Sequence, residues 1–223
     1  MKNKKFMAAA LAVACALPLA LCACGPDDKK GGGDDDDVKL GEGMKQYVLE
    51  AEYTPVADKI GGAQSGSASG YDLIIPSSAA GVSNGYFVSN MHMAGCKLEF
   101  EFTAERAGTA ALSVRMFSQW GSTTFNPSNF GIVLNGEEIT YTGILVQGAS
   151  DDKPKFADKV VTQKAAIKQG ENKLELIVRE NTLNSYTKST GAPAIDCVKI
   201  VTDTGITWDP ILENLEHVGS IVV

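Results

Sequence analysis

Residues that serve most often in catalytic and zinc sites are scarce in this sequence. The 223 residues include only two histidines, His92 and His217, and neither lies in a zinc-ligand spacing, a nucleophile elbow or a Ser–His–Asp pattern. The chain also has no phosphate-binding loop and no dinucleotide-binding fingerprint. These absences argue against triad hydrolases, zinc enzymes and nucleotide-dependent enzymes. The 27 acidic residues, however, still offer many carboxylate pairs of the kind that glycoside hydrolases use.

Amphipathic helix patterns are also missing between residues 47 and 201. This span instead contains short apolar or alternating runs separated by turn signals, one of which is the Asn135–Gly136 pair. Such spacing is typical of an all-β protein, and we predict an antiparallel β-sandwich of the jelly-roll type. The predicted strands are 47–53, 86–91, 97–103, 110–118, 131–134, 138–142, 159–167, 173–180 and 195–202.

The N-terminus has the features of a bacterial lipoprotein signal. A basic start is followed by an apolar run that is too short to span a membrane comfortably, and the run ends in LCAC at Leu21–Cys24. This end resembles the lipobox of bacterial lipoproteins, so we predict a signal peptide over 1–23 and a lipid-modified Cys24. Cys22 is the lesser candidate, because Leu21 precedes it where the pattern prefers a small residue. An ordinary signal peptide with incidental cysteines is the alternative.

The mature chain would be strongly acidic. Cleavage before Cys24 removes Lys2, Lys4 and Lys5 and no acid, which leaves 17 basic against 27 acidic residues. The resulting net charge of −10 argues against nucleic acid as a partner. Residues 24–45 contain much Gly and Asp and almost no apolar residue, which predicts a flexible, disordered tether.

The folded part is predicted to be one domain over 46–204, followed by a C-terminal tail over 205–223. In the tail, the stretch ILENLEH at 211–217 predicts a short helix capped by Asp209. Whether the end of the tail packs on the sandwich or binds a partner is left open by the sequence.

Two cysteines remain beyond the anchor, Cys96 and Cys197. An exported chain could bridge them in a disulfide. Both, however, lie in stretches that are predicted to enter the core, where free thiols are also common. Both possibilities stay open at this point.

Two carboxylates stand out in the first predicted strand, YVLEAEY at Tyr47–Tyr53. The period of two places Glu50 and Glu52 on one face and the apolar side chains on the other. Like charges on one strand repel, so the pair is either solvated or held by a hard divalent cation such as Ca²⁺ together with a third carboxylate. Asp196, in the last predicted strand of the domain, is the candidate for that third carboxylate.

Several short motifs occur in a fixed order from Tyr47 to Val201. They are EAE at 50–52, GYFV at 85–88, a strand, turn and strand at 98–115, VLNG at 133–136, GEN before the apolar strand at 170–178, and IDCV at 195–198. In order and spacing they resemble the carbohydrate-binding modules of families six and thirty-five, which are calcium-binding, galactose-binding-like β-sandwiches. In these modules the first and third residues of the EAE strand and the Asp of the closing strand bind a structural Ca²⁺. The resemblance therefore implies this role for Glu50, Glu52 and Asp196.

Carbohydrate binding requires an exposed ring on which a sugar can stack and a few polar groups that orient the sugar. Trp120 is the first candidate, because its surroundings, QWGSTTFNPSN, are polar and contain glycine; a ring that caps the sandwich edge is the alternative. Phe156 lies near the position where the resemblance implies a platform tryptophan. Asn90 stands where many members have a second stacking aromatic, and Ala194 stands where some have a hydrogen-bonding Asn. Tyr86, Asn184 and Tyr186 are the further candidates.

We therefore predict a non-catalytic lipoprotein of the bacterial cell surface that binds a polysaccharide or glycan through a calcium-stabilised sandwich. The first alternative is an adhesion or assembly protein that uses the same sandwich, or its C-terminal tail, to bind a protein partner. The second is a glycoside hydrolase-like enzyme.

The lipid anchor can be tested by cell fractionation. Cys24→Ala should release the protein from the membrane fraction, because the acyl chains on this thiol supply the apolar area that holds the chain in the bilayer. Cys22→Ala is the matched control and should stay membrane-bound. Retention of the Cys24→Ala protein would contradict the predicted anchor.

Overall fold

A computed structural model describes residues 38, 40–56, 73–148, 155–184, 188–189 and 192–218, with the side chains of 183, 184, 188, 189 and 217 left undescribed. All of these residues belong to the compact unit Asp34–Val223. The predicted signal peptide, the predicted lipid anchor at Cys24 and most of the predicted tether lie outside the described residues.

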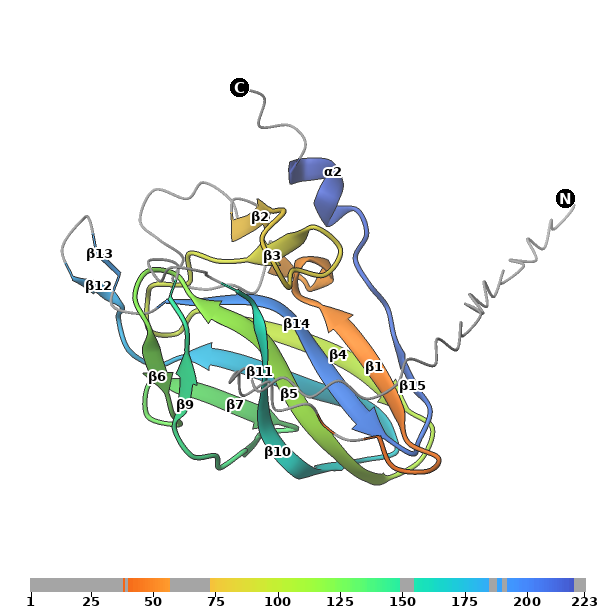
Figure 1. Ribbon diagram of the computed structural model, residues 1–223. Coiled ribbons are helices and arrows are strands. Elements are labelled where there is room, and N and C mark those ends of the chain that lie inside the picture. Colours follow the sequence, from red (N-terminus) through yellow and green to blue (C-terminus); the bar gives the residue numbers. More distant parts are fainter. Residues whose placement is uncertain are drawn as a thin grey trace, which may run out of the picture. The chain divides into compact units, whose positions relative to one another are not determined.

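Two antiparallel sheets pack face to face and confirm the predicted β-sandwich (Figure 1). The first sheet has the order β10-β5-β14-β3-β2, with β1 also paired to β14. Its strands are β1 (Lys45–Glu50), β2 (Ile74–Pro76), β3 (Tyr86–Val88), β5 (Gly108–Ser118), β10 (Ala157–Ile167) and β14 (Pro193–Thr202). The second sheet has the order β15-β4-β11-β7-β8. Its strands are β4 (Lys97–Ala104), β7 (Phe130–Leu134), β8 (Glu137–Glu138), β11 (Gly170–Val178) and β15 (Ile206–Trp208).

Four short strands and two short helices complete the described chain. β6 (Thr123–Phe125) pairs with β9 (Ile144–Val146), and β12 (Leu183–Asn184) pairs with β13 (Lys188–Ser189). The helices are the 3₁₀ helix η1 (Ala51–Tyr53) and the α-helix α2 (Asn214–Val218). All pairings between these named strands are antiparallel, as the short turn-rich spacing of the sequence predicted.

The core lies between the two sheets and follows from the alternation along their strands. In β4, Leu98, Phe100 and Phe102 are buried against the facing sheet, whereas Glu101 between them is exposed. This burial of one face removes apolar area from water and is the main stabilising contribution to such a sandwich. β14 is buried along nearly its whole length, because it runs through the centre of the first sheet.

The tight turn between β7 and β8 forms where the sequence predicted it. Asn135 and Gly136 have φ values of 55° and 84° and join β7 to β8. Positive φ at both central residues is what a tight hairpin turn of this kind requires, and Asn–Gly is the pair that adopts it at least cost. The predicted hairpin is therefore confirmed.

The first predicted strand is shorter than expected. β1 ends at Glu50, and Ala51–Tyr53 form η1 instead of continuing the strand. Glu52 therefore leaves the period-two pattern that was used to place it beside Glu50. Both cysteines of the domain, Cys96 and Cys197, are buried free thiols, so the possible disulfide is not present.

The second sheet continues into the predicted C-terminal tail. Ile206, Thr207 and Trp208 pair with Ala104, Thr103 and Phe102 of β4. Because α2 begins only at Asn214, Asp209 lies too far before it to act as the predicted cap.

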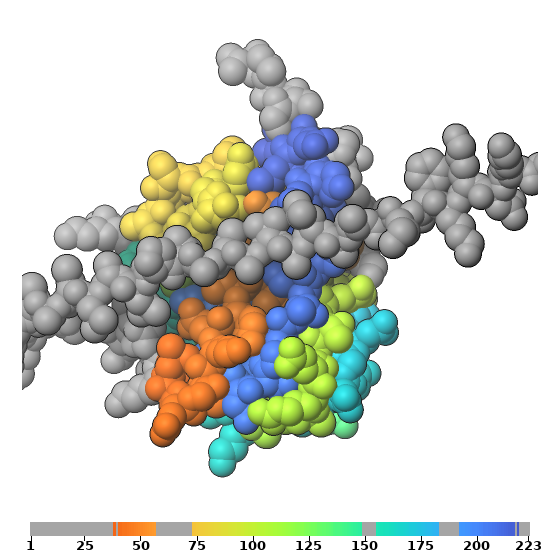
Figure 2. Space-filling view, turned by 90° about the vertical axis from the view of Figure 1, so that its right-hand side faces the viewer, coloured from red at the N-terminus to blue at the C-terminus, as the bar shows by residue number. Residues whose placement is uncertain are grey.

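Beyond β15, the tail is held against η1. The Asn214 side chain donates from Nδ2 to the carbonyl oxygens of Glu52 and Thr54, at 2.8 and 2.7 Å, and Ile211 N donates to Tyr53 O at 3.0 Å. The N-terminal strand in orange and C-terminal residues in blue accordingly lie side by side in Figure 2. The described tail is thus part of the folded unit and fixes the backbone that carries Glu52.

Candidate functional site

The candidate cation site forms where the neighbour along one edge of β14 changes from β1 to β3. Along one edge of β14, Glu50 at the end of β1 pairs with Cys197, while β3 reaches β14 only at Ile195. Along the other edge, the pairing of β14 with β5 shifts register between Ile195 and Cys197, so Asp196 is the extra residue of a β-bulge. As a result, the ligand atoms of Glu50, Asp196 and Cys197 all lie within 4.8 Å of one another.

Ser83, in the turn between β2 and β3, closes this cluster. Its backbone N donates to both carboxylate oxygens of Asp196, at 2.9 and 3.1 Å. Its Oγ lies 2.7 Å from Asp196 Oδ2 and 2.7 Å from Glu50 Oε2. A hydroxyl has one proton to donate, so both short contacts can be hydrogen bonds only if one of the two carboxyl groups is protonated.

Glu52 lies beside the cluster, and one of its carboxylate oxygens lacks a hydrogen-bond partner among the described residues. Asn84, which has a φ of 50°, donates from Nδ2 to Glu52 Oε1 at 2.9 Å and contacts the Tyr53 hydroxyl at 2.6 Å. The second oxygen, Oε2, has no hydrogen-bond partner among the described residues, although Glu52 is 0% exposed. An unpaired buried carboxylate oxygen is costly unless the group is protonated or meets a positive charge.

Burial raises the pKa of all three carboxyl groups. The pKa of Glu52 rises to about 7, chiefly because the side chain is buried, and the negative charges of Glu50 and Asp196 raise it further. Burial likewise raises the pKa values of Glu50 and Asp196. In the folded protein without a cation, burial therefore disfavours the charged form of each of these carboxyl groups.

Nearby basic side chains only partly offset this negative charge. Arg115 donates from Nε and Nη2 to Asp158, at 2.9 and 2.8 Å, and Lys199 forms an ion pair with the same carboxylate. These two cations are thus shared with a fourth acid. The surroundings of Glu50, Glu52 and Asp196 retain excess negative charge.

The donor set fits a divalent cation. Carboxylate, hydroxyl and amide oxygens are the ligands that Ca²⁺ takes, and Glu52 Oε2 is a buried acceptor that lacks a partner within the described chain. Sequence reasoning selected Glu50, Glu52 and Asp196 but missed Ser83, Asn84 and Cys197. The Asn84–Gly85 pair was an available turn signal, whereas nothing local indicates that this turn reaches β14.

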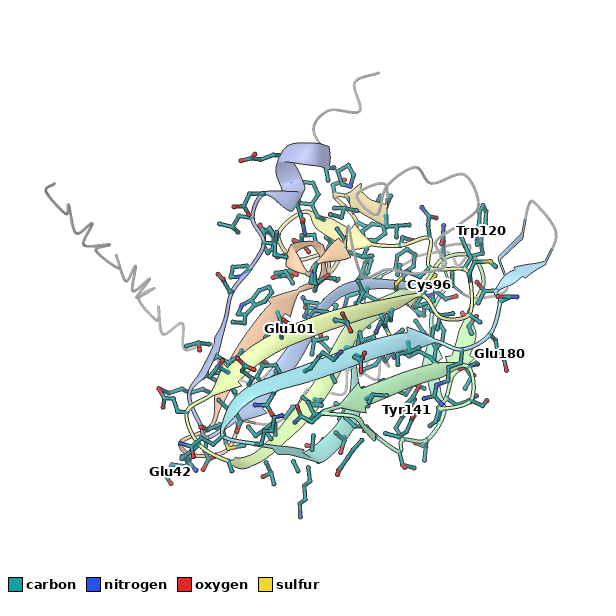
Figure 3. All side chains as sticks on the ribbon, turned by 180° about the vertical axis from the view of Figure 1, so that it is seen from behind. Glu42, Cys96, Glu101, Trp120, Tyr141 and Glu180 are labelled. Atoms are coloured by element: carbon teal, nitrogen blue, oxygen red, sulfur yellow. The ribbon has the colours of Figure 1, made fainter. Side chains whose placement is uncertain are left out.

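A second candidate site lies at one end of the sandwich, around Trp120. The indole follows β5, is 49% exposed and belongs to neither buried apolar cluster (Figure 3). The neighbouring Gln119 donates from Nε2 to Asn90 Oδ1 at 2.6 Å, and Asn90 N donates back to Gln119 Oε1 at 3.3 Å. Gln119 N also donates to Ala192 O, which ties this loop to the segment leading into β14. The exposed ring therefore belongs to a loop in which the preceding side chain, Gln119, is held by hydrogen bonds to Asn90.

The structure contradicts the prediction that Phe156 contacts a sugar. Its ring is 2% exposed and packs against Phe87 and Phe117, with centroid distances of 5.0 and 4.4 Å. Ala194 is buried in the same cluster. A phenylalanine in this place completes a three-ring cluster instead of presenting a platform to solvent.

Of the remaining sugar-binding candidates, the structure describes the side chains of Tyr86 and Asn90 only. Tyr86 is half-buried and packs against the core. Asn90 is the partner of Gln119 described above. Asn184 is described only through the backbone of β12, and Tyr186 lies outside the described residues.

A groove of about 860 Å³ lies on the outer face of the second sheet. Its floor carries outward-facing side chains of β4 and β11, among them Glu101, which Figure 3 labels, and Lys173. Trp208 of β15 lines one side and also packs against the core. The charged floor gives this groove a different character from the Trp120 end.

Comparisons with known proteins give a likeness of fold alone. No protein-family model matches this chain, and no curated protein matches its sequence. A family 35 carbohydrate-binding module from an environmental isolate is similar in structure, with a TM-score of 0.49 and 17% identity over 74% of this chain and 98% of that one. A second such module, from Cellvibrio japonicus, gives 0.47 and 14% over 74% and 97%. A third, from Clostridium thermocellum, gives 0.46 and 20% over 70% and 98%.

These identities are low and the TM-scores modest, so they assign no function to this chain. In the part of the chain that the structure describes, no helix has the length and apolar character needed to cross a membrane.

The pKa of Glu52 predicts how the stability of the cation-free protein depends on pH. Between pH 4.5 and about 7 the unfolded chain releases the Glu52 proton while the folded protein keeps it, so the free energy of unfolding should fall as pH rises through this interval. Urea midpoints measured in chelator at a series of pH values would show this slope. Glu52→Gln should reduce the slope, whereas Gln at the exposed Glu171 should leave it unchanged. A midpoint that rises over the same interval in the wild type would contradict the assignment.

Proposed function

We propose that this protein is a non-catalytic carbohydrate-binding module, stabilised by Ca²⁺ and held at the bacterial cell surface by a lipid on Cys24. The observation that carries the proposal is the exposed indole of Trp120, which follows Gln119 in the chain, a residue hydrogen-bonded to Asn90. The family resemblance of residues 47–201 supports it, and so does the acidic cluster.

In the cation site, Glu50, Glu52 and Asp196 would hold Ca²⁺. Its charge would neutralise their mutual repulsion and provide a partner for the unpaired oxygen of Glu52. Because Glu52 and Asp196 are 0% exposed, the ion would act on stability and not on a bound sugar. The chain's own part is to bring β1, η1, the β2–β3 turn and β14 together around one point.

At the Trp120 end, an exposed ring face can cover the axial hydrogens of a pyranose while side-chain amides exchange hydrogen bonds with its hydroxyl groups. The amides of Gln119 and Asn90 are already oriented by their mutual hydrogen bonds, so little side-chain freedom is lost on binding. A short loop on a rigid sandwich is well suited to this task.

The buried state of the acidic cluster favours a binding protein over the hydrolase alternative. Glycoside hydrolysis requires two carboxyl groups that face a sugar and a water in an open cleft. Glu52 and Asp196 are fully buried and are held by Asn84 and Ser83. They cannot reach a glycosidic bond in this arrangement.

The adhesion alternative finds no support in the described part of the tail. Residues 206–208 complete the second sheet, and Ile211 and Asn214 bind η1. These groups are occupied within the same chain, and residues 219–223 lie outside the described residues.

The calcium proposal predicts a ligand-dependent melting temperature. Excess Ca²⁺ should raise the melting temperature of the chelated protein, because an ion at a hundred times its dissociation constant adds about 2.7 kcal/mol to the stability of the folded state. Asp196→Asn should remove most of this gain, whereas Asn at the exposed Asp203 should retain it. If chelator leaves the wild-type melting curve unmoved, the three carboxyl groups form only a buried polar cluster.

The binding proposal predicts that one side chain accounts for much of the affinity. Trp120→Ala should weaken binding to the polysaccharide that retards the wild type in affinity gels by about tenfold or more, because a buried aromatic contact contributes on the order of 2 kcal/mol. The melting temperature should change little, since the ring packs outside the core. Leu145→Ala, at another exposed apolar side chain, is the matched control and should bind normally. Unchanged affinity in Trp120→Ala with a loss in Trp208→Phe would place the sugar in the groove of the second sheet instead.

A further inference from the structure

The acidic cluster contains a side chain that calcium does not explain. Cys197 is 0% exposed, is a free thiol, and its Sγ lies with the ligand atoms of Glu50 and Asp196 inside the 4.8 Å cluster. Calcium takes oxygen ligands, so the sulfur would contribute nothing to a calcium site. A thiol together with carboxylates is a ligand set that Zn²⁺ can accept.

Two features of the backbone bring the thiol to this place. Glu50 and Cys197 are directly opposite in the β1–β14 register, so their side chains lie on the same face. The bulge at Asp196 interrupts the alternation that would otherwise send Asp196 and Cys197 to opposite faces. Three potential ligands from two strands therefore converge without any change of fold.

We propose that this cluster also binds a thiophilic divalent cation such as Zn²⁺, through Cys197, Glu50 and Asp196, in competition with Ca²⁺. The inference rests on the cation site of the proposed function and concerns which ion that site accepts. Zn²⁺ takes Cys sulfur and carboxylate oxygen together and is satisfied with three protein ligands and one further donor. On binding, a metal–sulfur bond replaces the S–H bond of Cys197, and the thiol proton passes to solvent.

A second observation is a buried acceptor near this cluster that lacks a partner in the described chain. Glu52 Oε2 is fully buried beside the cluster and is without a hydrogen-bond partner among the residues described. Ser83 Oγ, which contacts both Glu50 and Asp196, is available as a further oxygen donor. The half-buried side chain of Glu50 connects the cluster to solvent, so an ion can enter.

The experiment uses the mature chain with Cys24→Ala, so that Cys24 contributes no thiol. Co²⁺ serves as the spectroscopic probe, because thiolate coordination gives a sulfur-to-metal charge-transfer band that oxygen ligands do not give. The band should appear in this protein and in its Cys96→Ala variant, and it should be absent from Cys197→Ser. Zn²⁺ should raise the melting temperature, and Cys197→Ser should weaken Zn²⁺ binding on the order of tenfold or more.

Calcium provides the comparison that separates the two proposals. Cys197→Ser should keep the calcium-dependent gain in melting temperature, since Ca²⁺ does not use the sulfur. Added Ca²⁺ should also reduce the Co²⁺ band of the Cys197-containing protein, and this competition needs no variant that might fail to fold. A calcium gain without a Co²⁺ band would overturn the thiolate inference and leave the calcium proposal standing. A Co²⁺ band without any effect of Ca²⁺ on the melting temperature would overturn the calcium proposal and leave the thiolate inference standing. A band that persists in Cys197→Ser would assign the thiolate to another cysteine and overturn the inference.

Discussion

The structure depends on the accommodation of buried negative charge at the point where β14 changes its neighbour. Glu50 and Asp196 share a single serine hydroxyl, and Glu52 keeps one buried oxygen without a partner in the described chain. Among the described residues, the hydrogen-bond donors are too few to satisfy all of these groups in their charged forms. Protonation of a carboxyl group or a bound cation would each relieve this shortage.

The carboxyl groups proposed to bind a cation and the ring proposed to bind a sugar lie in different parts of the sandwich. The carboxyl groups lie where β1, β14 and the β2–β3 turn meet, and Glu52 and Asp196 are fully buried, whereas Trp120 is exposed on the loop that follows β5. A hydrogen-bonded backbone links the two places, since Gln119 is tied to Ala192 just before β14. A cation in the acidic cluster would therefore stiffen the frame on which the exposed ring is carried without touching a ligand at that ring.

Sequence alone predicted the parts of this molecule that depend on local patterns. Alternation in β4 and β11 and the Asn135–Gly136 turn were sufficient for the antiparallel sandwich, because period and turn chemistry act over a few residues. Three features escaped it. Glu52 lies on η1 and not on a strand, and Phe156 is enclosed by Phe87 of β3 and Phe117 of β5. Asp196 and Cys197 reach the same cluster only through a bulge, which is visible in the register against β5 but not in the residues of β14 themselves.

The tail gives the cation site a connection that local patterns could not reveal. Asn214 binds the carbonyl oxygens of Glu52 and Thr54, so docking of the tail fixes the same backbone whose side chain faces the cluster. A cation that draws Glu52 into a defined position lowers the entropic cost of docking the tail, and a docked tail lowers the entropic cost of ordering Glu52 around the cation. Such coupling is reciprocal by thermodynamic necessity. Through Asn214, the described part of the tail would therefore be energetically coupled to a cation bound near Glu52, in addition to the pairing of residues 206–208 with the second sheet.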